Sequence, residues 1–187
     1  MKIIALNSNY DNPTTTMHNG VTVMTDSSLA KSGKPWFVPD FAESFSYTPH
    51  IVLRIGRLGK NIGQRFALRY IDAVTVGCTV NASGLNGALG NAFDGAAMLG
   101  EMLPVEQAGD LAALTATVTN GSATTVCRAS EMAMPIDEII AWVSQYFTLK
   151  IGDLIYTGAT GVFTPLTIGD TVRGSINGEA LLDIRIK

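Results

Sequence analysis

The stretch Phe147-Thr-Leu-Lys-Ile-Gly-Asp-Leu-Ile-Tyr-Thr-Gly-Ala-Thr-Gly161, followed by Pro165-Leu-Thr-Ile-Gly-Asp-Thr-Val172, is the most informative part of the chain. In both parts a Gly-Asp pair follows an apolar residue and precedes a β-rich run, as in a turn that feeds a strand. The pattern predicts either two hairpin turns in a β domain or, around Thr157-Gly-Ala-Thr-Gly161, a loop of small residues that faces a ligand.

The composition favours one domain over residues 1–187, long enough to bury a core. Hydrophobic residues make up 47% of the chain and charged residues only 16%, which excludes a disordered chain and argues against nucleic-acid binding. The net charge of −3 makes phosphate backbones poor partners. So low a charge leaves room for a buried self-association surface.

The apolar runs indicate neither a membrane span nor a secretion signal. Each is broken by Gly, Asp or Arg well before the ~20 residues needed to cross a bilayer, and Met1-Lys-Ile-Ile-Ala-Leu6 lacks a long apolar region. Cys78 and Cys127 lie far apart in Val/Thr-rich segments, which predicts two reduced core thiols. Together these features predict a cytoplasmic protein.

Strands outnumber helices in the expected secondary structure. An Asn120-Gly121 pair within Leu111–Arg128 predicts a hairpin, and the β-branched run Ile71–Val80 predicts a central strand buried on both faces. Ile136, Ile139, Ile140 and Val143 share one face of a helix that starts after Pro135. The remaining expectations are strands at 2–6, 21–24 and 50–55, a helix within 60–70, and a short strand ending at Phe37–Asp40.

Several short motifs, in order and with the right spacing, resemble those of the fumarylacetoacetate hydrolase family. The clearest are Gly152-Asp-Leu-Ile-Tyr-Thr-Gly158 and Pro165-Leu-Thr-Ile-Gly-Asp170, which follow the helix ending in Trp142-Val-Ser-Gln-Tyr-Phe-Thr-Leu-Lys150. Earlier matches are Asn9-Tyr10, Asp26-Ser-Ser-Leu29, Val38-Pro-Asp-Phe41, Ala67-Leu-Arg-Tyr-Ile-Asp-Ala73 and Phe93-Asp-Gly95. The resemblance covers nearly the whole chain.

This resemblance implies a strand-dominated α+β fold, a mixed β-sandwich roll with a few short helices, and a homodimer. Members of the family hydrolyse, isomerise or decarboxylate acylpyruvates and related 2-oxo acids with Mg²⁺ or Mn²⁺. Such an ion prefers carboxylate oxygens, and it stabilises enolate charge as a Lewis acid. The family supplies two Glu residues in a His-Tyr-Glu-x-Glu strand and an Asp at the end of the central strand.

None of these three carboxylates is present in this sequence. The two Glu positions fall on Thr48 and His50, and the Asp position falls on Thr79. Two hydroxyls and one imidazole do not compensate the dehydration of Mg²⁺, and one His rarely suffices for Zn²⁺. We therefore hypothesise that the metal site is degenerate and expect no cofactor; Mg²⁺ or Mn²⁺ would bind only if the family site were retained.

Six positions of the expected active site are candidates for substrate binding or catalysis. The resemblance assigns Tyr10, Asn91, Thr157 and Gly158 to substrate binding, although Asn91 replaces the family's Lys. His50 is either a catalytic base or a hydrogen-bonded strand histidine. His18 is either an acid–base group in a flap or an exposed loop histidine. A histidine can act as a catalyst only where the fold places it within reach of the reacting group.

Three functions follow from these residues. The first is a family enzyme with rearranged chemistry that acts on small 2-oxo acids. The second is a catalytically silent member that binds a small molecule, such as a small organic acid, or a protein partner through the Thr157-Gly158 loop. The third is a purely structural subunit of a dimer. Family resemblance does not by itself carry the activity.

Overall fold

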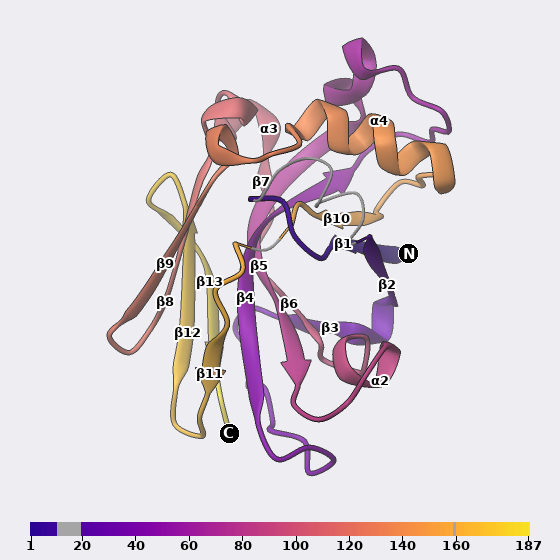
Figure 1. Ribbon diagram of the computed structural model, residues 1–187. Coiled ribbons are helices and arrows are strands. Elements are labelled where there is room, and N and C mark those ends of the chain that lie inside the picture. The colour runs from indigo at the N-terminus through magenta and orange to yellow at the C-terminus, as the bar shows by residue number, and fades with distance from the viewer. Residues whose placement is uncertain (11–19, 159) are drawn as a thin grey trace.

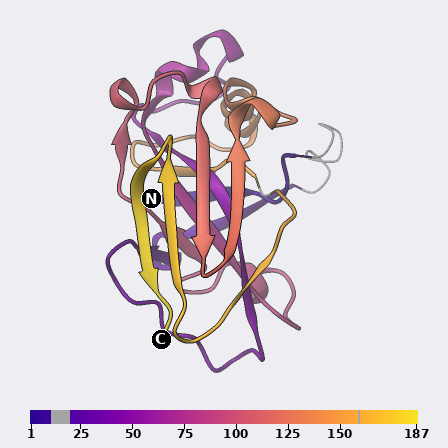
Figure 2. The ribbon, with the colours of Figure 1, turned by 90° about the vertical axis from the view of Figure 1, so that its left-hand side faces the viewer.

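The computed structural model describes residues 1–10, 20–158 and 160–187 and shows two packed β-sheets bordered by short helices (Figure 1). The strand-dominated α+β fold expected from the sequence is confirmed. In the view of Figure 2 the smaller sheet stands in front of the strongly curled larger one. No helix among the described residues is long and apolar enough to cross a membrane.

The larger sheet is mixed and has the order β2-β1-β10-β4-β5-β6-β3, with β11 pairing to β4 and β7 to β5. Its parallel pairs are β1 with β10 and β3 with β6, and the other pairs are antiparallel. Its strands are β1 (Lys2–Leu6), β2 (Val21–Thr25), β3 (Leu29–Lys31), β4 (Phe45–Ile55), β5 (Ile71–Ala82), β6 (Ala97–Leu99), β7 (Leu103–Pro104), β10 (Leu154–Tyr156) and β11 (Thr164–Leu166).

The smaller sheet is antiparallel, with the order β13-β12-β8-β9. It contains β8 (Thr115–Asn120), β9 (Ala123–Arg128), β12 (Thr171–Ile176) and β13 (Glu179–Arg185). The hairpin predicted at Asn120-Gly121 is confirmed, and Gly121 has the positive φ of 58° that such a turn requires. Apolar side chains of β8 and β12 pack on β5 and close the main core.

The β4–β5 ladder separates this core from a second interior inside the curl of the larger sheet. Side chains alternate between the faces of a strand. On β5, Val74, Val76, Cys78 and Val80 therefore enter the main core, while Thr79 and its alternate neighbours face the other way. On β4, Ile51 and Leu53 belong to the main core and Val52 to the second apolar cluster. This alternation leaves Thr48 and His50 inside the curl.

The Gly152-Asp153 and Gly169-Asp170 turns are present, but the hairpin interpretation of this stretch is wrong. Gly152 and Gly169 have φ values of 84° and 99°, which glycine adopts without strain. The strand after the first turn, β10, does not pair with the next strand in sequence and lies instead between β1 and β4. The second turn joins β11 in the larger sheet to β12 in the smaller one. Local turn chemistry cannot specify these long-range partners.

Helices occupy less of the chain than strands. The predicted helix over Ile136–Tyr146 is confirmed as α4, with Ile136, Ile139, Ile140 and Val143 buried. The helix expected within 60–70 is the 3-10 helix η2 (Gln64–Tyr70). No strand forms at Phe37–Asp40, because only Trp36 makes an isolated bridge, to Ile186. The other short helices are α2 (Ala88–Asn91), α3 (Val105–Ala108), η1 (Asp26–Ser28), η3 (Leu111–Ala113) and η4 (Ala129–Glu131).

Asn9 connects the end of the first strand segment to two distant parts of the chain. Its side-chain amide donates to the carbonyls of Met134 and Thr157, each at 2.9 Å, and its Oδ1 accepts from the Met134 N–H at 2.8 Å. The residue is fully buried, so these bonds satisfy a polar group that would otherwise be costly. Asn9 therefore fixes the position of the Thr157-Gly158 segment.

Candidate functional site

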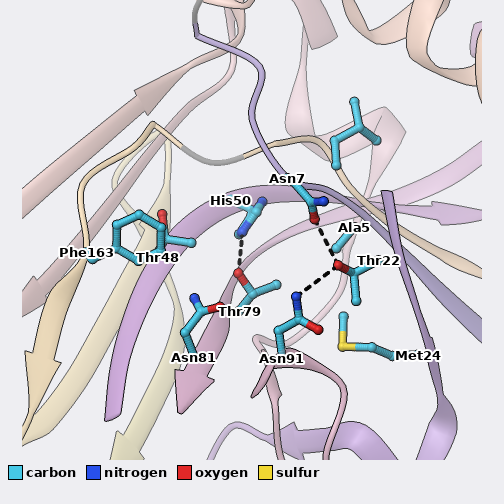
Figure 3. A pocket seen from close by; sticks show the side chains of 11 residues that line it. Ala5, Asn7, Thr22, Met24, Thr48, His50, Thr79, Asn81, Asn91 and Phe163 are labelled. Atoms are coloured by element: carbon cyan, nitrogen blue, oxygen red, sulfur yellow. Dashed lines mark hydrogen bonds between the residues drawn. The ribbon is translucent and has the colours of Figure 1, made fainter. Parts of the chain in front are cut away.

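A cavity of about 160 Å³ lies inside the curl of the larger sheet, beside the β4–β5 ladder (Figure 3). Its floor is buried: Leu6, Met24, Thr48 and His50 are each at most 2% exposed. Phe163, which is 55% exposed, contributes to the outer wall. The full set of lining residues is Ala5, Leu6, Asn7, Thr22, Met24, Thr48, His50, Thr79, Asn81, Asn91 and Phe163.

Strand register brings the three positions of the expected metal site together. Thr48 and His50 are two residues apart on β4 and therefore share a face. Thr79 on β5 is the direct register partner of Thr48. All three side chains line the same cavity, as Figure 3 shows. The family resemblance predicts that these three positions share one site, and the fold brings them together.

His50 is held by two hydrogen bonds that define its tautomer. The Gly158 N–H donates to Nδ1 at 3.3 Å, so Nδ1 carries a lone pair and no proton. The proton of the neutral ring is then on Nε2, which lies 2.9 Å from Thr79 Oγ1 and donates to it. The ring also packs edge-on against Tyr156, with centroids 5.5 Å apart. Both nitrogens are therefore used within the protein.

Burial keeps His50 neutral. The residue is 1% exposed, and desolvation of the charged form lowers its pKa from 6.5 to about 3. A histidine with this pKa is a weak base and is almost entirely unprotonated at neutral pH. Of the two readings of His50, the geometry matches the hydrogen-bonded strand histidine.

The rest of the described wall is uncharged and combines apolar residues with polar ones. On one side, Asn91 Nδ2 donates to Thr22 Oγ1 at 3.2 Å, and the Thr22 hydroxyl donates to Asn7 Oδ1 at 2.9 Å (Figure 3). On the other side, Thr48 Oγ1 is buried and has no hydrogen-bond partner among the described residues. None of the described residues that line the cavity is Asp, Glu, Lys or Arg.

This donor set does not fit a hard divalent cation. Mg²⁺ is held through carboxylates, substrate phosphates and water, whereas Thr48 and Thr79 supply neutral hydroxyls. His50 has no free nitrogen for a metal, because one accepts from Gly158 and the other donates to Thr79. Across the described residues no cluster of three or more His, Cys, Asp or Glu side chains could hold a metal ion.

The other predicted site residues take different positions. Asn91 lines the cavity, whereas Thr157 and Gly158 lie behind its wall. Thr157 Oγ1 donates to the Ile51 carbonyl at 2.9 Å, and Gly158 acts on the site only through its N–H bond to His50. Tyr10 does not line the cavity, and burial, reinforced by Cys127, raises the pKa of its hydroxyl. His18 lies outside the described residues.

The cysteines stay out of the site and are free and buried in the core, as the sequence predicted. Burial raises the pKa of the Cys127 thiol to about 12, so neutral pH leaves it protonated.

The lining residues that sequence reasoning missed are Ala5, Leu6, Asn7, Thr22, Met24, Asn81 and Phe163. Asn81 was recoverable, because it is two residues beyond Thr79 on the same strand and so shares its face. Phe163 was not, because it follows a loop whose path depends on the pairing of β11 with β4.

Comparison with known proteins identifies one family for nearly the whole chain. The family model described as fumarylacetoacetate (FAA) hydrolase C-terminal matches residues 2–186. A mitochondrial oxaloacetate tautomerase of Caenorhabditis elegans is 24% identical over 187 aligned residues, covering 91% of this chain and 87% of the relative.

Solved structures show the same fold. Fumarylpyruvate hydrolase from Pseudomonas aeruginosa, solved in complex with Mn²⁺ and pyruvate, superposes with a TM-score of 0.87 and 19% identity, covering 100% of this chain and 89% of the other. A 5-carboxymethyl-2-hydroxymuconate delta-isomerase from Mycobacterium smegmatis gives a TM-score of 0.85 and 22% identity, covering 99% and 78%.

Proposed function

Because this chain belongs to the fumarylacetoacetate hydrolase family, we propose that it is a member that binds a small organic molecule without a divalent cation. The observation that carries the proposal is the set Thr48, His50 and Thr79. It occupies one wall of a cavity with neutral groups at the positions where the family resemblance implies carboxylates. A cavity lined by hydrogen-bonding groups favours binding over a purely structural role.

Metal-dependent cleavage or isomerisation of 2-oxo acids is the function expected from the resemblance, and relatives carry names of this kind. That chemistry uses a cation to chelate the oxo-acid head and to stabilise enolate charge. The described residues of the wall offer no carboxylate to hold the cation. We therefore propose that this protein binds a molecule of the same small size by hydrogen bonds.

Proton transfer without a metal would need a working acid or base. His50 is the one titratable side chain among the described lining residues, and its pKa is about 3. General acid–base catalysis is efficient when the pKa of the catalytic group is close to the working pH. His50 does not meet this condition, which supports binding as the proposed function.

Methyl-detected NMR tests the proposal. Protein labelled at Ala, Thr and Met methyls is titrated, in the presence of EDTA, with pyruvate, oxalate, pyruvamide and lactamide. We expect at least one probe to shift the methyl signals of Met24, Thr48 and Thr79, and to leave that of Thr117 in the smaller sheet unchanged. Probes that act only after Mn²⁺ is added, or that never shift the lining signals, would contradict the proposal.

Turnover is measured on the same samples. Oxaloacetate and acetylpyruvate are followed by ultraviolet absorbance in EDTA and in Mn²⁺ buffer. We expect both rates to equal those without protein. A rate that rises with Mn²⁺ would contradict the proposal and support metal-dependent catalysis.

A further inference from the structure

Among the described residues, the wall of the cavity contains no group that could neutralise an ionised ligand at neutral pH. The described lining side chains include no Lys or Arg, and the one side chain able to become cationic is His50. Its Nδ1 is blocked by the Gly158 N–H, since a protonated Nδ1 would oppose that donor. Protonation of His50 would therefore break a bond that holds the ring in place.

The floor of the cavity is also deeply buried. Ala5, Leu6 and Met24 on one side and Thr48 and His50 on the other are each at most 3% exposed. A carboxylate placed against such a floor loses its hydration without gaining a counter-charge, and a buried unpaired charge is far more costly than a buried neutral polar group. Neutral groups can exchange their bonds to water for bonds to the wall at little net cost.

The hydrogen bonds of the wall determine which neutral groups would match it. Thr79 Oγ1 accepts from His50, so its own hydroxyl proton can be donated to a carbonyl oxygen of a ligand. Asn81, on the same face of β5, presents an amide that can both donate and accept. A ligand with a carbonyl next to an amide or hydroxyl would therefore find complementary partners.

The volume limits the ligand to a very small molecule. Pockets for drug-sized molecules usually enclose roughly 300–1,000 Å³, and this cavity has about 160 Å³. An engineered cavity of about 150 Å³ in another protein binds benzene, which has about six non-hydrogen atoms. Pyruvamide and lactamide have the same number of non-hydrogen atoms.

We propose that the cavity selects an uncharged molecule of this size, one that carries a carbonyl beside an amide or hydroxyl group, over the corresponding carboxylate. This inference rests on the proposed function, because it assigns a ligand class to the same site. It differs from the small organic acid that the family resemblance suggested. The reason is that no Lys or Arg lines the described wall and that no cluster of described side chains could hold a metal ion.

Matched probes of equal size test the charge preference. Pyruvamide and pyruvate differ only in an amide against a carboxylate, as do lactamide and lactate. The dissociation constant of each is measured at neutral pH in EDTA from the Thr79 methyl shift. We expect each amide to bind at least about tenfold more tightly than its acid, because only the acid leaves a buried charge unpaired.

Two threonine variants assign the effect to the wall. Thr79→Val removes the hydroxyl donor and should weaken pyruvamide binding by about tenfold. Thr117→Val makes the same chemical change on a half-buried threonine of the smaller sheet and should leave binding unchanged. In the Thr79→Val protein the Met24 methyl serves as the reporter. Both variants are checked for folding by their full NMR spectra.

The outcomes separate this inference from the proposed function. Tighter binding of pyruvate than of pyruvamide would overturn the charge preference while leaving a ligand site in place. Binding of neither class at the lining residues would overturn both. Equal loss of pyruvamide binding in the Thr79→Val and Thr117→Val proteins would show that the wall does not select the ligand.

Discussion

At the scale of single residues, Thr48 and Thr79 are register partners whose hydroxyl groups differ in hydrogen bonding. Thr79 Oγ1 receives the His50 Nε2–H at 2.9 Å, whereas Thr48 Oγ1 is buried without a partner among the described residues. An unsatisfied buried polar group lowers stability, and a satisfied one does not. Removing the two hydroxyls should therefore change the free energy of unfolding in opposite directions.

We predict that Thr48→Val raises the free energy of unfolding by about 1 kcal/mol, because it removes an unpaired buried hydroxyl. Thr79→Val should lower it by about 1–3 kcal/mol, because the His50 N–H loses its acceptor. Urea denaturation monitored by circular dichroism measures both. Changes of the same sign in the two variants would show that the bonding pattern assigned to this wall is wrong.

The protonation of His50 gives a pH-dependent prediction. Its folded pKa is about 3 and its ordinary value is 6.5, so between these values the unfolded chain binds one proton more than the folded chain. The stability from His50 is thus complete above the unfolded pKa and declines as the pH falls toward the folded pKa. From about pH 7.5 to about pH 5 the loss should be about 2 kcal/mol.

His50→Gln is the comparison protein, because it keeps a polar side chain and removes the titration. Urea midpoints of both proteins are measured across the same pH range, which stays above the range where most carboxyl groups titrate. The other histidine, His18, is present in both proteins and cancels in the difference. Parallel pH profiles for the two proteins would mean that His50 is not held neutral.

Gly158 shows how a single backbone position supports the site. It has a φ of 118°, and a Cβ there would lie 2.2 Å from Asn9 Cβ and 2.9 Å from Asn9 N. Asn9 cannot move aside easily, because its side chain is fixed by bonds to Met134 and Thr157. The glycine therefore lets the chain pass close enough to donate its N–H to His50.

Gly158→Ala should lower the free energy of unfolding by at least about 3 kcal/mol, through the clash and the backbone strain together. Gly152→Ala is the matched control: its φ of 84° is also positive, but no atom lies within 4 Å of the added methyl. The control should cost only about 1–2 kcal/mol. Thermal or urea unfolding compares them, and similar losses would rule out the steric account.

At the scale of elements, the sequence predicted well what depends on local periodicity and turn chemistry. The boundaries of α4 and the β8–β9 hairpin follow from an apolar face behind Pro135 and from Asn120-Gly121. The position of β10 between β1 and β4 could not be read from the chain, because pairing over more than a hundred residues leaves no local signal.

For the candidate site as well, the features that depend on local sequence were predictable and the long-range contacts were not. Two-residue alternation placed Thr48 and His50 on one face, and the family resemblance added Thr79. The Gly158 N–H bond to His50 joins residues 108 positions apart and depends on where β10 inserts. The resemblance assigns Thr157 and Gly158 to substrate binding, and in the structure the Gly158 N–H donates to His50, which lines the cavity.

The amphipathic helix α4 provides an element-scale prediction. Ile140 is fully buried in the main core, whereas Gln145 on the same helix is exposed. Ile140→Ala should cost about 2–5 kcal/mol, because it removes buried methyl groups and leaves a cavity. Gln145→Ala should change stability by less than about 0.5 kcal/mol. Urea unfolding measures both, and a small effect at Ile140 would contradict the assigned packing of the helix.

At the scale of the whole molecule, the framework of the family is kept, and we propose that the chemistry of its cavity differs from the metal chemistry that the resemblance implies. The family model matches from residue 2 to residue 186, and the fold superposes on that of fumarylpyruvate hydrolase with a TM-score of 0.87. Against this background, three neutral side chains occupy the positions where the resemblance implies metal-binding carboxylates. The shared fold does not by itself carry the activity of these relatives over to this chain.

The most direct measurement is a calorimetric titration of the chelator-stripped protein with Mn²⁺, first alone and then with oxalate, which mimics the enolate of pyruvate. Fumarylpyruvate hydrolase from Pseudomonas aeruginosa, solved with Mn²⁺ and pyruvate, is the positive control. We predict no heat beyond dilution for this protein in either titration, because Thr48, His50 and Thr79 supply no anionic oxygen. Micromolar binding of Mn²⁺ that oxalate tightens would contradict the account.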